Sequence, residues 1–310
     1  NNSAINDFIK KDLSKFSIFI ISKSGKTLET LTNCNIILNN LRKRKKNISK
    51  NFIVISERNN ILSNFARKNN LIFFEHNTNL SGRYSVLSEA GLLMFNLDYK
   101  KIIQGINSVL KKGLNQNLIR NAATLLTLMT KFKINTHVSL IYSHNLLSYG
   151  YWHQQLLAES IGKKGKDFTP IISECPKDHH SIMQLYLDGR KNKFFTFFKT
   201  INNKLDKPIK DYFDQKFKKN SLNNIIDSQF NATINVFKKN LIPFRVVLID
   251  QKKPIQSFIS LIVYSMLETA ILCKALNLNP FNQPAVEEIK KETYSPVSYT
   301  HLTLPTILLV

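Results

Sequence analysis

Short apolar runs alternate with longer stretches of helical periodicity along this chain. The apolar runs indicate β-strands at residues 16–21, 51–56, 71–76, 137–143, 193–198 and 244–249. The helical patterns lie at residues 27–43, 85–97, 118–132 and 145–162. Mainly apolar strands separated by helices are typical of parallel sheets covered on both faces. The pattern occurs twice, so the sequence predicts two α/β domains with a boundary between residues 96 and 136.

One further apolar segment, residues 255–276, has a length close to the ~20 residues that a membrane span requires. It contains Gln256, Glu268 and several hydroxyl side chains, and it carries no aromatic belt. These features are typical of a buried helix in an α/β protein. We therefore expect no membrane partner.

The formal net charge of +23 at pH 7 raises the question of a nucleic-acid partner. Only eight of the 44 basic residues are arginine, the side chain whose planar fork matches phosphate and guanine. Abundant Lys, Asn and Ile share A/T-rich codons and indicate a biased genome instead. The dense basic cluster at residues 41–50 fits a solvated helix end. We expect no nucleic-acid partner, and an anionic small substrate would gain from the positive surface.

The three cysteines, Cys34, Cys175 and Cys273, lie far apart and show neither metal spacing nor a disulfide framework. The N-terminal residues contain no apolar segment of signal-peptide length. These observations predict a cytoplasmic protein without a bound metal.

The stretch SKSGKTLET, residues 22–30, follows the first predicted strand and carries candidate chemistry. A nucleotide-binding phosphate loop needs G-x-x-x-x-G-K-[ST], but Ile20 occupies the position of the first glycine. The alternative is a cup in which Ser22, Ser24 and Thr27 converge on a phosphate group at a helix N-terminus. A simple helix cap would need fewer such side chains. The pattern therefore favours a sugar phosphate over a nucleotide.

Four later blocks follow in order: SGRYSVLSEAGLL at 81–93, WHQQLLAESIGKKG at 152–165, DHHSIMQLYLDG at 178–189 and NPFNQPAVEEIKK at 279–291. Together with SKSGKTLET they resemble the glucose-6-phosphate isomerase family over residues 16–291. The resemblance implies two sugar-isomerase (SIS-type) domains of three α/β/α layers with mainly parallel sheets. It also implies a homodimer with sites at the subunit interface. The implied reaction converts glucose 6-phosphate to fructose 6-phosphate through an enediol and needs no metal or redox cofactor.

The resemblance also divides the chain. We expect a partial first domain with the phosphate loop at residues 1–110, a second domain at 111–278 and a C-terminal helical segment at 279–294. Pro296 breaks the preceding helical pattern, residues 295–310 follow no pattern of their own, and we expect them not to be native sequence. The family has a Gly-Gly-Ser loop in a preceding strand–turn–helix unit, and nothing in residues 1–15 matches it. We therefore expect a fragment whose first sheet lacks strands.

By resemblance, Glu159 is the base that moves the proton between C2 and C1. Arg83, after a glycine, would stabilise the enediolate. His180 would open the sugar ring and would reach the site of the neighbouring subunit. Its neighbour His179 is the competing candidate, but the family places this histidine directly before Ser or Ala. An alternative metal site at Cys175, His179 and His180 lacks ordered ligand spacing.

Lys290 matches the lysine that works with this histidine, although Lys291 beside it is chemically equivalent. Gln283 would contact the phosphate, and Lys23 would supply a counter-charge next to the cup.

Two other functions stay open. A non-catalytic sugar-phosphate-binding module would use the cup without Glu159, His180 and Lys290. A basic nucleic-acid binder would show steeply salt-dependent DNA binding. Within the enzyme class, the sequence leaves open whether mannose 6-phosphate is also a substrate.

Overall fold

The chain divides into two compact units, Asn1–Lys101 and Ile102–Val310, and each is described by itself. The computed structural model describes residues 2–43, 51–95, 97–110, 116–202, 206, 208–210, 220–286, 288–289 and 292–293. The division after Lys101 lies within the boundary range predicted at residues 96–136, and nine residues before the domain limit expected at residue 110. The reason is that the helix ending at Leu110 packs on the second unit. A Cβ at Gly105 would lie 2.7 Å from the Ile259 side chain, so the two helices are in close contact.

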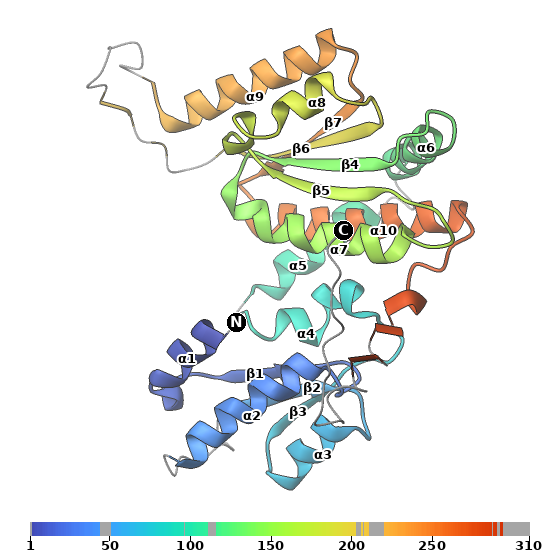
Figure 1. Cartoon of the computed structure of the whole chain (residues 1–310). Coiled ribbons are helices and arrows are strands. Elements are labelled where there is room, and N and C mark those ends of the chain that lie inside the picture. Colours follow the sequence, from blue (N-terminus) through green and yellow to red (C-terminus); the bar gives the residue numbers. More distant parts are fainter. Residues whose placement is uncertain are drawn as a thin grey trace, which may run out of the picture. The chain divides into compact units, whose positions relative to one another are not determined.

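The first unit holds a three-stranded parallel sheet in the order β1-β2-β3 (Figure 1). Its elements are α1 (Asn2–Lys10), η1 (Leu13–Lys15), β1 (Ile18–Ile21), α2 (Leu28–Lys43), β2 (Phe52–Ser56), α3 (Ile61–Lys68), β3 (Ile72–Glu75), η2 (Gly82–Leu87) and α4 (Glu89–Leu92). Apolar residues of α2 and α3 share one core with β1 and β2. The three strands predicted for this part of the chain are confirmed. The helix predicted at 85–97 is instead a 3-10 helix followed by a short α-helix, because Ser88 caps a new start by accepting from Ala90 N.

The second unit holds a four-stranded parallel sheet in the order β5-β4-β6-β7. Its elements are α5 (Tyr99–Leu110), α6 (Gln116–Thr130), β4 (Thr136–Ile141), η3 (His144–Leu146), α7 (Leu147–Ile161), β5 (Thr169–Glu174), η4 (Lys177–His179), α8 (Met183–Asp188), β6 (Lys193–Ile201), α9 (Leu222–Lys239), β7 (Phe244–Asp250) and α10 (Pro254–Ala275). The predictions of β4, β6 and β7 are confirmed. We did not predict β5, an edge strand with the sequence TPIISE, in which Pro170 weakens the strand signal.

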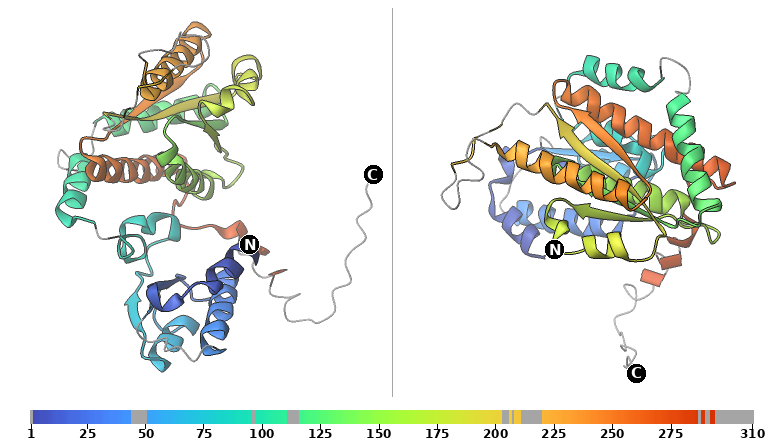
Figure 2. Two further views of the ribbon diagram at one scale, coloured as in Figure 1. Left: turned by 90° about the vertical axis from the view of Figure 1, so that its left-hand side faces the viewer. Right: turned by 90° about the horizontal axis from the view of Figure 1, so that it is seen from above.

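Helices cover both faces of this second sheet (Figures 1 and 2). Along β6, Phe195 and Phe197 face a core shared with α8 and α9, whereas Phe194 faces a core shared with α6, α7 and α10. Successive side chains of a strand point to opposite faces, so a central strand covered on both sides is apolar at nearly every position. The prediction of an α/β fold built on mainly parallel sheets is confirmed.

Helix α10 is long and apolar enough to cross a membrane by length and composition. It packs against α6, α7 and β7. Its Glu268 carboxylate receives two hydrogen bonds from Arg245 on β7, with N–O distances of 2.6 and 2.8 Å. Half of its most apolar stretch is buried within the second unit.

Two histidines lie in the core between the sheet and α7. His137 on β4 and His153 on α7 are 1% and 2% exposed, and their ring centroids are 5.6 Å apart. The His137 Nε2 atom lies 2.7 Å from the Thr196 hydroxyl. Burial lowers the pKa of His153 to about 3 and lowers the pKa of His137 well below 6.5. Both imidazoles are therefore neutral in the folded protein near pH 7.

These histidines make the second unit acid-sensitive. The unfolded chain binds protons at both imidazoles below pH 6.5, but the folded chain does not, so stability falls as the pH drops through this range. We expect each buried histidine to lower the free energy of unfolding by about 1.4 kcal/mol per pH unit in that range. Urea unfolding between about pH 7 and about pH 5, followed by Trp152 fluorescence, measures the slope. His153→Phe should reduce this slope by the contribution of one proton, which is about 1.4 kcal/mol per pH unit.

Replacing His144, whose side chain is 83% exposed, provides the matched control. An unchanged slope in His153→Phe would contradict the role of the buried histidine in this pH dependence. An equal fall in His144→Gln would contradict it as well.

Candidate active site

The turn between β1 and α2 gathers the hydroxyl groups predicted to bind phosphate. The Ser22 and Thr27 hydroxyl oxygens lie 2.8 Å apart, and the Ser24 hydroxyl accepts a hydrogen bond from Lys26 N. Ser22 is buried, whereas Ser24 and Thr27 are exposed. The turn lies at the carboxyl end of a parallel strand and at the N-terminus of a 16-residue helix. Ligands bind at this position in open α/β sheets, and the helix end favours an anion.

Gly25 and Asn60 hold this turn in shape. Gly25 has a φ of +66°, a left-handed conformation that favours glycine, and its amide donates to the Ser22 carbonyl. Asn60 caps α3 by accepting from Leu62 N and Ser63 N, and its amide nitrogen donates to Ser56 Oγ at 2.7 Å. Sequence reasoning missed Asn60, although N-x-x-S before an apolar helix is a recognisable start signal.

The two predicted cations of this unit are held differently. The Lys23 ammonium donates to the Thr78 carbonyl at 2.7 Å and lies 3.8 Å from the Glu57 carboxylate. Arg83 lies in η2 and is only 2% exposed. In the same unit, the buried His76 ring bonds the Glu89 carboxylate and joins the end of β3 to α4. Sequence reasoning missed this pair, because two residues thirteen positions apart show no local pattern.

In the second unit, Glu159 and Gln283 line one cavity of about 470 Å³. Glu159 lies near the C-terminal end of α7, half-buried, and its Oε1 accepts a hydrogen bond from the Gln155 amide at 2.9 Å. Gln283 belongs to the segment after α10. That segment is held against α7, because Lys163 Nζ donates to the Asn279 carbonyl at 2.5 Å. The structure therefore brings together two residues that are far apart in the sequence.

The DHHS block distinguishes its two histidines. The His179 ring is half-buried, and its Nε2 lies 2.8 Å from the Tyr142 hydroxyl and 3.4 Å from the Thr233 hydroxyl. Burial, and then the neighbouring His180, lowers the pKa of His179. His180 is exposed. His179 is thus engaged within its own unit, and His180 is the histidine with its side chain at the surface.

Glu159 and His180 lie at opposite ends of the strands of the second sheet: Glu159 toward the amino ends and His180 at the carboxyl ends. Helix α7 begins just after the carboxyl end of β4 and runs back to the amino edge, where Gln154 donates to the Pro170 carbonyl at the start of β5. His180 follows the carboxyl end of β5. At about 1.5 Å of rise per helical residue, Glu159 lies roughly 18 Å along α7 from Leu147. One chain therefore does not bring these two side chains together within this unit.

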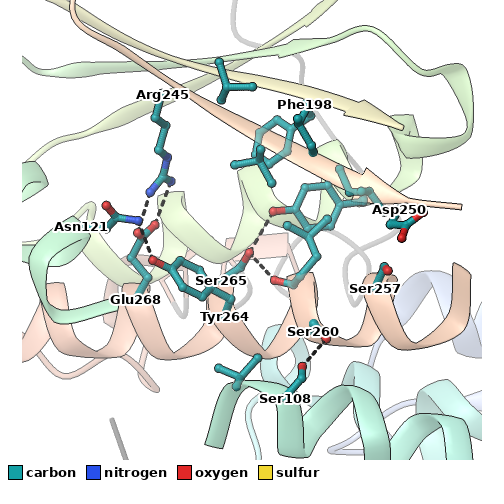
Figure 3. Close-up of a pocket in the computed structure, with 17 residues that line it drawn as sticks. Ser108, Asn121, Phe198, Arg245, Asp250, Ser257, Ser260, Tyr264, Ser265 and Glu268 are labelled. Carbon is teal, nitrogen blue, oxygen red and sulfur yellow. Dashed lines mark hydrogen bonds and ion pairs between the residues drawn. The ribbon is translucent and has the colours of Figure 1, made fainter. Parts of the chain in front are cut away.

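A second cavity, of about 580 Å³, lies between β7 and α10. Figure 3 shows its polar groups pointing at one another: Arg245 at Glu268, Asn121 at Tyr264 and Ser108 at Ser260. It contains none of the residues predicted from sequence. Most of its polar side chains bond one another, which is typical of a structural network.

Lys290 and the tail at 295–310 fall outside the described residues, as does the competing Lys291. Within the part of the chain that the structure describes, no three His, Cys, Asp or Glu side chains form a group that could hold a metal ion.

Comparisons with known proteins give one consistent result. The family model for phosphoglucose isomerase matches residues 2–188. A probable glucose-6-phosphate isomerase from Methanococcus maripaludis is 34% identical over 287 residues, which is 90% of this chain and 65% of that protein. The glucose-6-phosphate isomerase of Methanocaldococcus jannaschii is 35% identical over 291 residues, which is 91% of this chain and 72% of that protein. The chain thus spans roughly two thirds of the length of these relatives.

Solved structures agree on the fold. A hypothetical protein from Thermus thermophilus matches with a TM-score of 0.87 and 23% identity, covering 96% of this chain and 76% of that one. A glucose-6-phosphate isomerase from Chlamydia trachomatis matches with a TM-score of 0.79 and 18% identity, covering 98% of this chain and 63% of that one.

The conformation of Gly25 leads to a prediction about the cup. An added Cβ would lie 2.4 Å from the Asn60 side chain, which cannot move without losing its cap on α3. We expect Gly25→Ala to destabilise the first unit by about 1–2 kcal/mol through the left-handed backbone, and by about 1 kcal/mol more through the cap. Thermal unfolding measures the loss.

Two glycines provide graded controls. Gly165 has a φ of +67° but open space around its Cβ position, so Gly165→Ala should show the backbone cost alone. Gly82 has open space and no left-handed backbone, so Gly82→Ala should cost least. Equal losses in all three variants would contradict the role of Asn60.

Proposed function

Because the chain belongs to the phosphoglucose isomerase family, we propose that it catalyses the reversible isomerisation of glucose 6-phosphate to fructose 6-phosphate. The observation that carries this proposal is the position of Glu159, in the AESIGK block, on the wall of a cavity shared with Gln283. A half-buried carboxylate beside a cavity can reach a carbon-bound proton of a ligand there. The reaction is a proton transfer between neighbouring carbons, so it needs no metal or redox cofactor.

The substrate phosphate is held by the first unit. Ser22, Ser24 and Thr27 supply hydroxyl donors, and the N-terminus of α2 supplies free backbone amides. Hydroxyl groups rotate, so Ser22 and Thr27 can exchange their mutual hydrogen bond for bonds to phosphate oxygens. Lys23 adds positive charge at the same turn, and Gln283 supplies an amide donor.

Glu159 takes the proton from C2 of the open-chain aldose and returns it to C1, while the hydroxyl proton of O2 passes to O1, which gives the ketose through an enediol. Negative charge develops on the carbonyl oxygen during this step. A fixed guanidinium stabilises such a charge because it needs no rearrangement when the charge appears. Arg83, buried in η2, is the residue we assign to this task.

His180 and Lys290 open the sugar ring by moving a proton between the ring oxygen and the C1 hydroxyl. The separation of His180 from Glu159 across the second sheet supports a homodimer in which His180 serves the site of the other copy. A two-fold dimer builds two equivalent shared sites from one interface. Cys34, Cys175 and Cys273 are buried and form no disulfide within the described part of the chain, which fits a cytoplasmic location.

A non-catalytic sugar-phosphate-binding module remains the second candidate, since the cup by itself would serve that function.

We expect Glu159→Gln to lower the rate of fructose 6-phosphate formation by at least ~100-fold, because the amide cannot accept the proton. Binding of glucitol 6-phosphate, which has no carbonyl group and cannot cyclise, should change little. A coupled rate assay and calorimetry measure the two effects.

Asp188→Asn is the control, because this exposed carboxylate bonds Gln184 on its own helix and does not line the cavity. An unchanged rate in Glu159→Gln would refute the assignment of the base. Absence of turnover in the unmodified protein, with intact glucitol 6-phosphate binding, would favour the binding module.

The shared site predicts complementation between inactive variants. A dimer of one Glu159→Gln chain and one His180→Ala chain has one site with both side chains intact and one site with neither. Random mixing of equal amounts should therefore restore about a quarter of the unmodified activity. Differently tagged chains, refolded together and separated by affinity, allow the heterodimer to be assayed. An inactive heterodimer would show that Glu159 and His180 of one chain act together.

A further inference from the structure

The loop that carries His180 is fixed by the side chain of Asp178. This residue lies in η4, between the end of β5 and the start of α8. Its Oδ2 accepts hydrogen bonds from Ser173 Oγ at 2.9 Å and from Glu174 N at 2.8 Å. Its Oδ1 accepts from Ser181 Oγ at 3.0 Å. The carboxylate therefore joins the last residues of β5 to the residue that follows His180.

The anchor on the β5 side is rigid. Ser173 is fully buried, and β5 pairs with β4 along its whole length, with Glu174 opposite Ile141. The two hydrogen bonds to Oδ2 therefore fix Asp178 relative to the sheet. Hydrogen bonds to a charged acceptor are roughly twice as strong as bonds between neutral groups, so this connection holds its geometry well.

The backbone around His180 is fixed as well. His180 N donates to the Lys177 carbonyl at 3.2 Å, and Ile182 N donates to the Asp178 carbonyl at 3.2 Å. On the preceding side, the His179 ring bonds the Tyr142 hydroxyl. His180 thus stands exposed on a backbone held at both ends, with its own side-chain torsions as its remaining freedom.

We propose that Asp178 is the positioning residue for His180, and that it sets the direction in which the imidazole leaves the second unit. The proposal rests on the proposed function, because it assigns to Asp178 a role in the ring-opening step. Asp178 touches no reacting atom: it acts through Ser181 and the η4 backbone. A ring-opening histidine must present its nitrogen within hydrogen-bond reach of the sugar oxygens, and a misplacement of about 1 Å can cost ~100-fold in rate.

The test compares Asp178→Ala with His180→Ala and with the double variant. We expect Asp178→Ala to lower kcat by about 10- to 100-fold, because a misplacement of the imidazole by about 1 Å can cost ~100-fold. KM and the affinity for glucitol 6-phosphate should change less than ~2-fold, because the phosphate cup and Glu159 are untouched. In the His180→Ala background, Asp178→Ala should add less than ~2-fold, because residues that act through one another are not additive.

Two conservative variants separate positioning from folding. In Asp178→Asn, the amide oxygen still accepts a hydrogen bond from Glu174 N, and the amide nitrogen can donate to Ser181 Oγ. This variant should therefore keep most of the rate that Asp178→Ala loses. Ser181→Ala removes only the Oδ1 hydrogen bond and should lower kcat by a few-fold with unchanged thermal stability. If Asp178→Ala does not fold, these two variants carry the test. Asp188→Asn is the matched control and should leave the rate unchanged.

An unchanged rate in Asp178→Ala, or full additivity with His180→Ala, would overturn the positioning role while leaving the isomerase function intact. A parallel loss of kcat and glucitol 6-phosphate binding would also overturn it, because it would indicate a general structural role. Absence of isomerisation by the unmodified protein would instead refute the proposed function, and the role of Asp178 would fall with it.

Discussion

The contact between α7 and the end of α10 is the constraint on which the candidate site in the second unit depends. Cys273 Sγ donates to the Ser160 carbonyl, Ser160 Oγ donates to the Pro280 carbonyl, and Lys163 donates to Asn279. These bonds turn the chain after α10 back across the end of α7. Glu159 and Gln283 share a cavity because of this turn. The deeper support is Arg245, which ties β7 to Glu268 on α10 and so fixes the helix beneath the sheet.

Parallel sheets impose a second constraint, since each helix that follows a strand must return to the amino edge. The topology therefore separates the end of α7 from the loop after β5 by about the length of a strand. This separation holds for any side chains at the two positions. In the proposed reaction, ring opening and proton transfer act on the same six-carbon sugar, so the separation of Glu159 and His180 within one chain supports a second copy. The topology of one subunit thus supports the dimer we propose, and a loop held as this one is suits a group aimed at another molecule.

Much of the fold was predictable from the sequence, because buried parallel strands are apolar at nearly every position. The strand β5 escaped notice because Pro170 and its half-buried edge position weaken that pattern. The expected domain limit at residue 110 differs from the division after Lys101, because the apolar face of α5 does not reveal which unit the helix packs on. The family blocks predict roles for Glu159, Arg83 and His180, but local sequence does not show Asn60 reaching Ser56 or Asp178 reaching Ser173. Such contacts depend on which strands become neighbours, which only the tertiary structure fixes.

Cavity size is a poor guide to function here, and the electrostatics explain why. The cavity between β7 and α10 is the larger of the two, but the charge of Arg245 is already matched by both oxygens of Glu268 (Figure 3). An anion entering there would have to replace two charge-assisted hydrogen bonds and leave a carboxylate buried without its partner, which is strongly unfavourable. The cup after β1 has no such obstacle, because the hydrogen bond between Ser22 and Thr27 joins two neutral hydroxyl groups. Two neutral hydroxyl groups can rotate and replace their mutual hydrogen bond with bonds to a phosphate oxygen at little cost. This turn therefore fits the proposed sugar phosphate better than the cavity does.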